Sequence, residues 1–268
     1  MNHIRHPAVA GMFYPADALT LKQDIQRYLE QAQSLNSDVV VKPLAIVVPH
    51  AGYIYSGPIA ASAYQYLIPV KHKIKRVILL GPSHRVAFNG LAVPETDIFN
   101  TPLGNISIDQ QSIRSILSLP QVIASDRAHE QEHSLEVQLP FLQEILDDFM
   151  LVPIVVGDAE RFEVAEVINK LLEQCNLKET LIVISSDLSH YHNYDEANRM
   201  DRATSDAIVH LKPELISYDD ACGRNGLKGM LTVAEQKNLS VDIVDLRNSG
   251  DTAGEKDRVV GYGAYVIH

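Results

Sequence analysis

Three histidines each follow an apolar run of the chain, and their side chains suit metal binding and proton transfer. His50 ends the segment AIVVPH, His84 ends RVILLGPSH and His190 ends LIVISSDLSH. Imidazole nitrogens bind iron, copper and zinc, and histidine exchanges protons near neutral pH. We therefore predict that His50 and His84, which each follow a strand and a proline-containing turn, bind a metal ion.

The segment that ends at His190 also carries groups that hold or move protons. Asp187 lies close to His190 in the sequence. A carboxylate there is expected to orient a histidine ring or to stabilise its protonated form, so that His190 acts as a general base. Serine hydroxyls in the same layer are expected to hydrogen-bond these groups. They belong to Ser83, Ser185, Ser186 and Ser189.

These side chains need a sheet that brings its strand ends together. Apolar runs alternate with amphipathic segments along the chain, which predicts βαβ units around a mostly parallel or mixed sheet flanked by helices. Ligands of an open α/β sheet bind beyond the carboxyl ends of its strands, where His50, His84 and His190 are expected to converge. No linker or repeat divides the sequence, so we predict a single α/β domain over residues 1–268.

The pattern also predicts the individual elements. Strands are expected to end at 50, to span 76–80, 151–156 and 181–185, and to close the sheet as VDIVDL and RVVGYGAYVIH. Helices are expected after Asp17, from Ser56, and over about 134–146, 160–174, 195–211 and 226–236.

Composition excludes several classes of protein. The 268 residues are 46% hydrophobic and 21% charged, as in ordinary globular proteins. The formal net charge of −11 argues against general binding to nucleic acid or to an anionic membrane, because such binding needs Lys and Arg. No apolar run has the length of a membrane span, and the start MNHIRHP lacks the apolar core of a signal peptide. We expect a cytoplasmic protein whose partners are small molecules, metal ions or proteins.

The chain has two cysteines, Cys175 and Cys222. A disulfide between them is not expected in a cytoplasmic protein. From residue type alone, Cys222 is predicted to be a small buried side chain, and Cys175 is predicted to have a structural role on a helix.

Two hydrolase patterns are the alternatives. Residues 129–133 read His-Glu-Gln-Glu-His, which satisfies both the H-E-x-x-H zinc motif and its inverted form. Every residue between His129 and His133 is polar and the apolar periodicity begins only at Leu135, which favours an exposed helix start with His129 on the solvent side. His133 can still face the pocket. The serines near Asp187 allow Ser/His/Asp hydrolysis, but the G-x-S-x-G elbow is absent and caps of strand-to-helix turns explain them better.

Several motifs in order resemble one protein family over nearly the whole chain. They are RHPAVAGMFYP, VPHAGYIYSG, LLGPSH, EHSLEVQLPFL, SSDLSHY, ACGR and GYGAY. Together they resemble the prokaryotic branch of the Memo-like family. The resemblance implies a fold shared with class III extradiol dioxygenases, which hold iron with two histidines and a carboxylate and use a further histidine as acid and base.

The resemblance implies roles for individual residues. His50 and His84 match the two metal-binding histidines and His190 matches the acid/base histidine, with Asp187 in the same motif. Cys222 of ACGR falls where the dioxygenases place their carboxylate. A thiolate is softer than a carboxylate, so it shifts the preference toward copper(I), zinc or thiolate-bound iron and away from ring-cleaving chemistry.

Two classes of function therefore follow. In the first, the protein is a metal-dependent oxidoreductase in which His50, His84 and Cys222 bind iron or copper, with zinc as the alternative metal. His190 and Asp187 then manage protons, with His133 facing the same pocket. In the second, the cleft is a non-catalytic module that binds a peptide or partner protein. The resemblance also implies a link with radical-SAM proteins.

Overall fold

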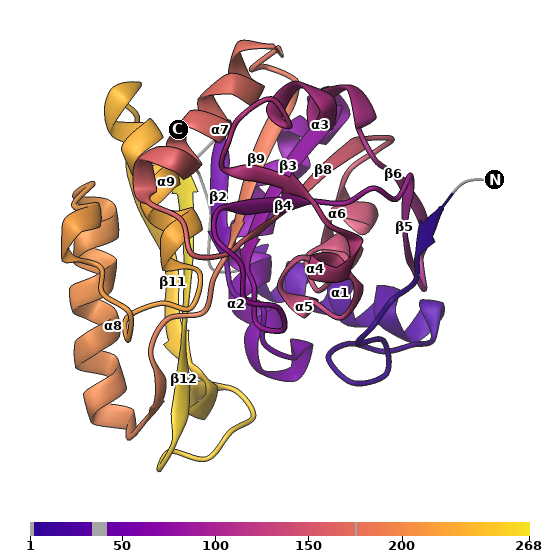
Figure 1. Ribbon diagram of the computed structural model, residues 1–268. Helices are drawn as coiled ribbons and strands as arrows, with labels where there is room; N and C mark the ends of the chain where they lie inside the picture. The colour runs from indigo at the N-terminus through magenta and orange to yellow at the C-terminus, as the bar shows by residue number, and fades with distance from the viewer. Residues whose placement is uncertain (1–2, 34–41, 175) are drawn as a thin grey trace.

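The computed structural model describes residues 3–33, 42–174 and 176–268, and its centre is a large mixed sheet flanked by helices (Figure 1). The middle of this sheet is parallel. It consists of β2 (Ala45–Val48), β9 (Thr180–Ser185), β3 (Arg76–Pro82) and β8 (Met150–Val156), in that spatial order. Nearly every residue of these strands is buried, as continuous apolar runs predict for strands covered on both faces. The α/β class and the mixed sheet predicted from sequence are confirmed.

Antiparallel strands extend the sheet on both sides. On one side, β12 (Val259–Ile267) runs antiparallel to β2, and both β11 (Val241–Asn248) and β10 (His190–His192) pair with β12. On the other side, β4 (Leu91–Val93) is antiparallel to β8 and parallel to β7 (Val122–Ala124). A separate small sheet joins β1 (Ile4–Arg5), β5 (Ile98–Thr101) and β6 (Gly104–Ser107).

Long helices pack on the large sheet. The helix α2 (Tyr53–Tyr64) contacts β2, β11 and β12, and α1 (Ala18–Gln33) lies against α2. The helix α9 (Arg224–Gln236) contacts β3 and β9 and packs on α7 (Arg161–Glu173), while α8 (Tyr194–Val209) contacts β11 and β12. Among the described residues, no helix is long and apolar enough to cross a bilayer.

Short elements complete the fold. The helices are α3 (Gln110–Ile116), α4 (Asp126–Glu130), α5 (His133–Glu136) and α6 (Leu139–Ile145). The 3₁₀ segments are Gln65–Lys73, Pro213–Leu215 and Ser249–Asp251. The prediction of one continuous helix over 134–146 is wrong, because the segment forms two separate helices, α5 and α6. Pro140 has no amide to donate to Glu136, which removes one bond of a continuous helix.

Candidate metal centre

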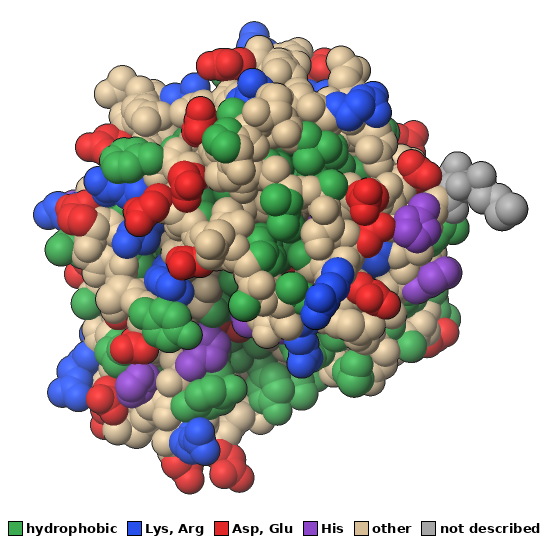
Figure 2. Space-filling view, viewed as in Figure 1, with side chains coloured by type: hydrophobic (Ala, Val, Ile, Leu, Met, Phe, Trp, Pro, Cys, Tyr) green, Lys and Arg blue, Asp and Glu red, His purple; other side chains and the backbone are tan. Residues whose placement is uncertain are grey.

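The carboxyl ends of β2, β3 and β9 open into one cavity of about 1360 Å³. His50 follows β2, His84 follows β3 and Asp187 follows β9, and all three line this cavity. His133, His190 and Cys222 line it as well. Figure 2 shows histidine side chains at a hollow on this face, with Lys and Arg side chains nearby. The parallel strands therefore bring the predicted residues together at one edge of the sheet.

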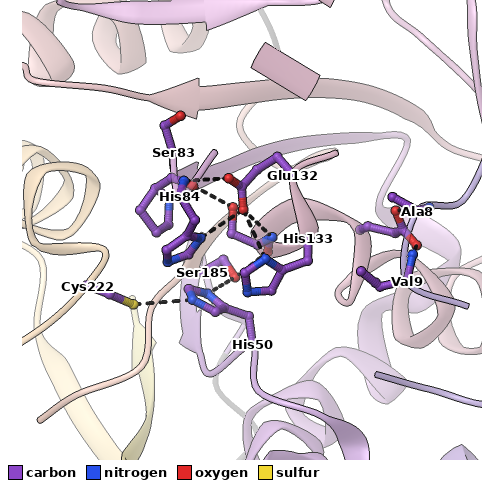
Figure 3. A network of polar contacts seen from close by, with 12 residues as sticks. Ala8, Val9, His50, Ser83, His84, Glu132, His133, Ser185 and Cys222 are labelled. Atoms are coloured by element: carbon purple, nitrogen blue, oxygen red, sulfur yellow. Dashed lines mark hydrogen bonds and ion pairs between the residues drawn. The ribbon is translucent and has the colours of Figure 1, made fainter. Parts of the chain in front are cut away.

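His50, His84 and Cys222 form the tightest group in this cavity. Each offers one ligand atom, and these atoms all lie within 4.8 Å of one another. The Nε2 atom of His50 lies 3.2 Å from the Sγ atom of Cys222 (Figure 3). Cys222 is anchored at the strand end, because the Asp187 amide donates to its sulfur at 3.3 Å and its own amide donates to the Asp187 carbonyl at 3.3 Å.

Hydrogen bonds determine which ring nitrogen of His50 is available to bind a metal ion together with His84 and Cys222. Its Nδ1 atom lies 2.9 Å from the hydroxyl of Ser185. That hydroxyl donates its single hydrogen to the carbonyl of Ser134 at 2.6 Å, so it must accept from Nδ1–H of His50. The Nε2 atom consequently carries the acceptor lone pair, and it lies 3.2 Å from the sulfur of Cys222. Burial, and then the nearby His84 and His133, hold the pKa of His50 well below its usual range, so the ring stays neutral.

Glu132 orients His84 in the same way. One carboxylate oxygen of Glu132 accepts from Nδ1 of His84 at 2.9 Å and from the amide of Ser134 at 2.9 Å, and the other accepts from the amide of His84 at 2.5 Å (Figure 3). Burial opposes ionisation of this carboxyl, but these hydrogen bonds lower its pKa to about 2. Glu132 is therefore an anion that holds the Nδ1–H form of His84 and leaves Nε2 for a ligand role.

The donor set fits a soft or borderline metal ion. Two imidazole nitrogens and one sulfur are the ligand types of copper(I), zinc and thiolate-bound iron. Burial, and then the Asp187 carboxylate, raise the pKa of the Cys222 thiol, so binding of a cation there must release a proton.

Comparison with known proteins agrees with the sequence motifs. The family model described as Memo-like protein matches residues 5–266. The chain belongs to the Memo-like family. A MEMO1 family protein of Aquifex aeolicus is 38% identical over 272 residues, which cover 97% of each chain. A MEMO1 family protein of Sulfolobus acidocaldarius is 37% identical over 279 residues, with 97% of each covered.

A solved structure also aligns with this Memo-like chain. It is described as the crystal structure of the uncharacterized protein JW3007 from Escherichia coli K12. The alignment covers 99% of the Memo-like chain and 100% of the other, with a TM-score of 0.46 and 11% sequence identity.

In this Memo-like protein, the residues predicted to transfer protons lie around His50, His84 and Cys222. They are His133, Asp187 and His190. The ring of His133 stacks on His84 with centroids 4.6 Å apart and meets His50 edge-on at 5.5 Å. Burial lowers the pKa of His133. The carboxylate of Asp187 accepts the amide of His50 at 2.7 Å, and burial raises its pKa despite the opposing effect of His190. Asp187 thus bonds to the backbone of His50, and His190 approaches the cavity from β10.

The prediction that His129 lies on the solvent side is wrong. Its side chain is buried, Nε2 lies 3.0 Å from the carbonyl of Ala92, and its ring packs edge-on against Phe99. Burial lowers its pKa to about 3. The second potential ligand group in the described part of the chain combines His84, Glu132 and His133 and does not include His129. The two histidines of the H-E-x-x-H motif therefore point to different places, and the zincin arrangement is absent from these described residues.

Sequence reasoning also missed the residues that support the centre. Glu132 is only 1% exposed, although its neighbours in the sequence are polar. Gln138 is equally buried and donates to the carbonyl of Pro49 and to Ser185. The one sequence feature that pointed to Glu132 was its position directly before His133. The zinc-motif interpretation of residues 129–133 gave that carboxylate no role in orienting a histidine. Cys175 lies outside the described residues, so its predicted role is not tested.

Proposed function

We propose that this Memo-like protein is a metal-dependent oxidoreductase whose metal ion is iron or copper, with zinc as the alternative metal. The observation that supports the proposal is the convergence of His50, His84 and Cys222 at the strand ends. His50 and His84 are each fixed through Nδ1 by a buried partner, so their ligand nitrogens are oriented in advance. A redox-active ion held there would supply electron transfer to or from a bound substrate.

The surrounding residues supply proton chemistry and shape. His190 lies in the cavity wall and accepts a proton from a substrate group. Asp187 fixes the backbone of His50 and adds negative charge beside His190. His133 and Phe13 pack together with ring centroids 4.7 Å apart, and this pair limits the space next to His84.

A second candidate function is binding without catalysis. The cavity of about 1360 Å³ exceeds the roughly 300–1000 Å³ that small ligands usually occupy. A peptide segment or part of a partner protein fits a cavity of that size. The resemblance to the Memo-like family suggests a radical-SAM protein as such a partner. In this reading the same cleft binds its ligand but lacks turnover.

Metal analysis after anaerobic purification tests the ligand set. Wild-type protein is expected to hold about one iron or copper ion per chain, and Cys222→Ser is expected to lose most of it because a hydroxyl is a poor ligand for a soft metal. Cys175→Ser, which changes the other cysteine of the chain, is the matched control. Metal content that survives Cys222→Ser unchanged would remove the thiolate from the site.

Oxygen uptake with catechol and thiol substrates then separates the two functions. His190→Ala is expected to keep its metal and to lose about 10²–10⁴-fold in turnover, the usual scale for a general acid or base. If metal-loaded wild-type protein consumes no oxygen with any of these substrates and binds a peptide through the same cleft, the binding function is correct.

A further inference from the structure

Three arginines that line the cavity have no carboxylate partner among the described residues. They are Arg85, Arg224 and Arg258. In the described part of the chain none of them forms an ion pair, whereas Arg5, Arg76 and Arg247 each do. The chain has 34 acidic residues against 23 basic ones, so acidic partners are abundant. Guanidinium groups left unpaired around one cavity are available to an anionic ligand.

Two of these guanidinium groups are held over tyrosine rings. The Cζ atom of Arg224 lies 4.4 Å from the ring centroid of Tyr218, and that of Arg258 lies 5.1 Å from the ring centroid of Tyr191. A ring beneath a guanidinium restrains its orientation and contacts its face, and it leaves the N–H groups at its edge free. Those N–H groups match the two oxygens of a carboxylate. The tyrosines therefore preorganise both arginines for an oxyanion.

The backbone at Tyr191 supports a role at the mouth of the cavity. Tyr191 has φ of 64°, in the left-handed region that aromatic residues seldom adopt. The pairing of β10 with β12 shifts register between His190 and His192, and Tyr191 is 64% exposed. Such strain is uncommon and concentrates at ligand sites. Here the strained residue is Tyr191, and the guanidinium of Arg258 lies over its ring.

Acidic residues also line the cavity, which limits any general attraction of anions. Asp158, Asp219 and Glu255 are exposed lining residues, and none of them pairs with the three arginines. With both signs of charge present, selectivity for an anion has to come from the directed N–H groups rather than from the overall potential.

We propose that the cleft binds an organic carboxylate, which Arg224 and Arg258 grip while the rest of the ligand extends toward His50, His84 and Cys222. Arg85 adds positive charge from the loop that follows β3. This inference names the ligand class of the proposed function and in that sense rests on it. Binding can nevertheless be measured in metal-free protein, so its failure and the failure of the metal centre are separate results.

The test uses benzoate as the probe and metal-free full-length protein, with affinity measured by ligand-observed NMR. Benzamide, the neutral analogue, is expected to bind about ten-fold or more weakly, because it lacks the charge that strengthens hydrogen bonds to arginine. Arg224→Gln and Arg258→Gln are each expected to weaken benzoate binding by about ten-fold. Arg202→Gln, at an exposed arginine of α8 outside the cavity lining, is the control and should stay within about two-fold.

Two further arms decide the chemistry of recognition. Arg224→Lys keeps the charge but loses the planar N–H pair, so it is expected to bind benzoate more weakly than wild type. Phenyl phosphate tests whether the oxyanion is a phosphate instead, and tighter binding of phenyl phosphate than of benzoate would overturn the carboxylate assignment. Equal binding of benzoate and benzamide, or full benzoate affinity in Arg224→Gln and Arg258→Gln, would overturn the arginine site altogether.

Discussion

Replacing Glu132 by glutamine should weaken both the fold and the proposed metal centre. Glu132 is buried and accepts from two groups of His84 and from the amide of Ser134. Glutamine has the same shape but only one acceptor oxygen, so in either orientation its NH₂ group faces an N–H donor. At least one charge-assisted bond is lost, and each such bond contributes about 1.5–3 kcal/mol.

Proton linkage gives a second measure of the same effect. The pKa of Glu132 is lowered to about 2 from an ordinary value of 4.5, because hydrogen bonds to the ionised form outweigh its burial. A shift of that size corresponds to about 3 kcal/mol of folding free energy at neutral pH. Because the folded-state pKa is depressed, this stabilisation is fully present above about pH 4.5 and is lost as the pH falls toward about 2.

Thermal unfolding and metal competition titrations measure the two consequences. We expect Glu132→Gln to lower the midpoint temperature of unfolding by about 6–12 °C. This range follows from a loss of about 3 kcal/mol of stability, with a shift of about 2–4 °C for each kcal/mol lost in a protein of this size. The affinity for copper or zinc should fall about 10–100-fold, because the imidazole of His84 loses its orienting anion. Glu130→Gln, at an exposed position of α4, is the matched control. A Glu132→Gln protein that matches this control in both measurements would refute the reasoning.

Three further outcomes are expected. His129→Ala should keep its metal content but lose about 2–4 kcal/mol of stability in urea unfolding, because its buried imidazole packs on Phe99 away from the centre. Tyr14→Phe should cost about 1.5–3 kcal/mol in the same assay, since its hydroxyl donates to the buried Glu136 carboxylate at 2.6 Å; no change would mean that the bond contributes nothing. Between pH 7 and pH 5, His129 alone should lower the free energy of unfolding of the wild-type protein by about 2 kcal/mol. Its pKa of about 3 keeps it neutral in the folded protein over this range, whereas the same histidine takes up a proton in the unfolded chain. His129→Ala should therefore have a shallower pH dependence, and an unchanged slope would contradict that assignment.

Much of the fold was predictable because burial leaves a local pattern in the sequence. The apolar runs that became β2, β3, β8 and β9 are buried along nearly their whole length, so the pattern found them directly. Their histidine-bearing tips could be assigned to one edge because parallel strands place their carboxyl ends together. The apolar run of β12 revealed a strand but not its direction, since antiparallel pairing with β2 depends on how the chain returns to the sheet.

The support of the site was not predictable in the same way. His129 and Glu132 have polar neighbours, and a polar segment reads as exposed unless its hydrogen-bond partners are known. Those partners are remote in sequence: His129 contacts Ala92, and Glu132 holds His84. Arg5 also donates to the carbonyls of both residues, at 2.8 Å each, from the start of the chain.

The family, the α/β sheet and the histidines at its strand ends could all be inferred from the amino-acid sequence. Only the tertiary structure placed the sulfur of Cys222 3.2 Å from His50 and gave His84 its carboxylate. Local patterns record which side chains avoid water, because burial of apolar groups repeats with the period of the element. They do not record which buried polar groups meet, since that depends on contacts between segments far apart in the sequence. Glu132 and His84 are 48 positions apart, and Cys222 and His50 are 172 positions apart.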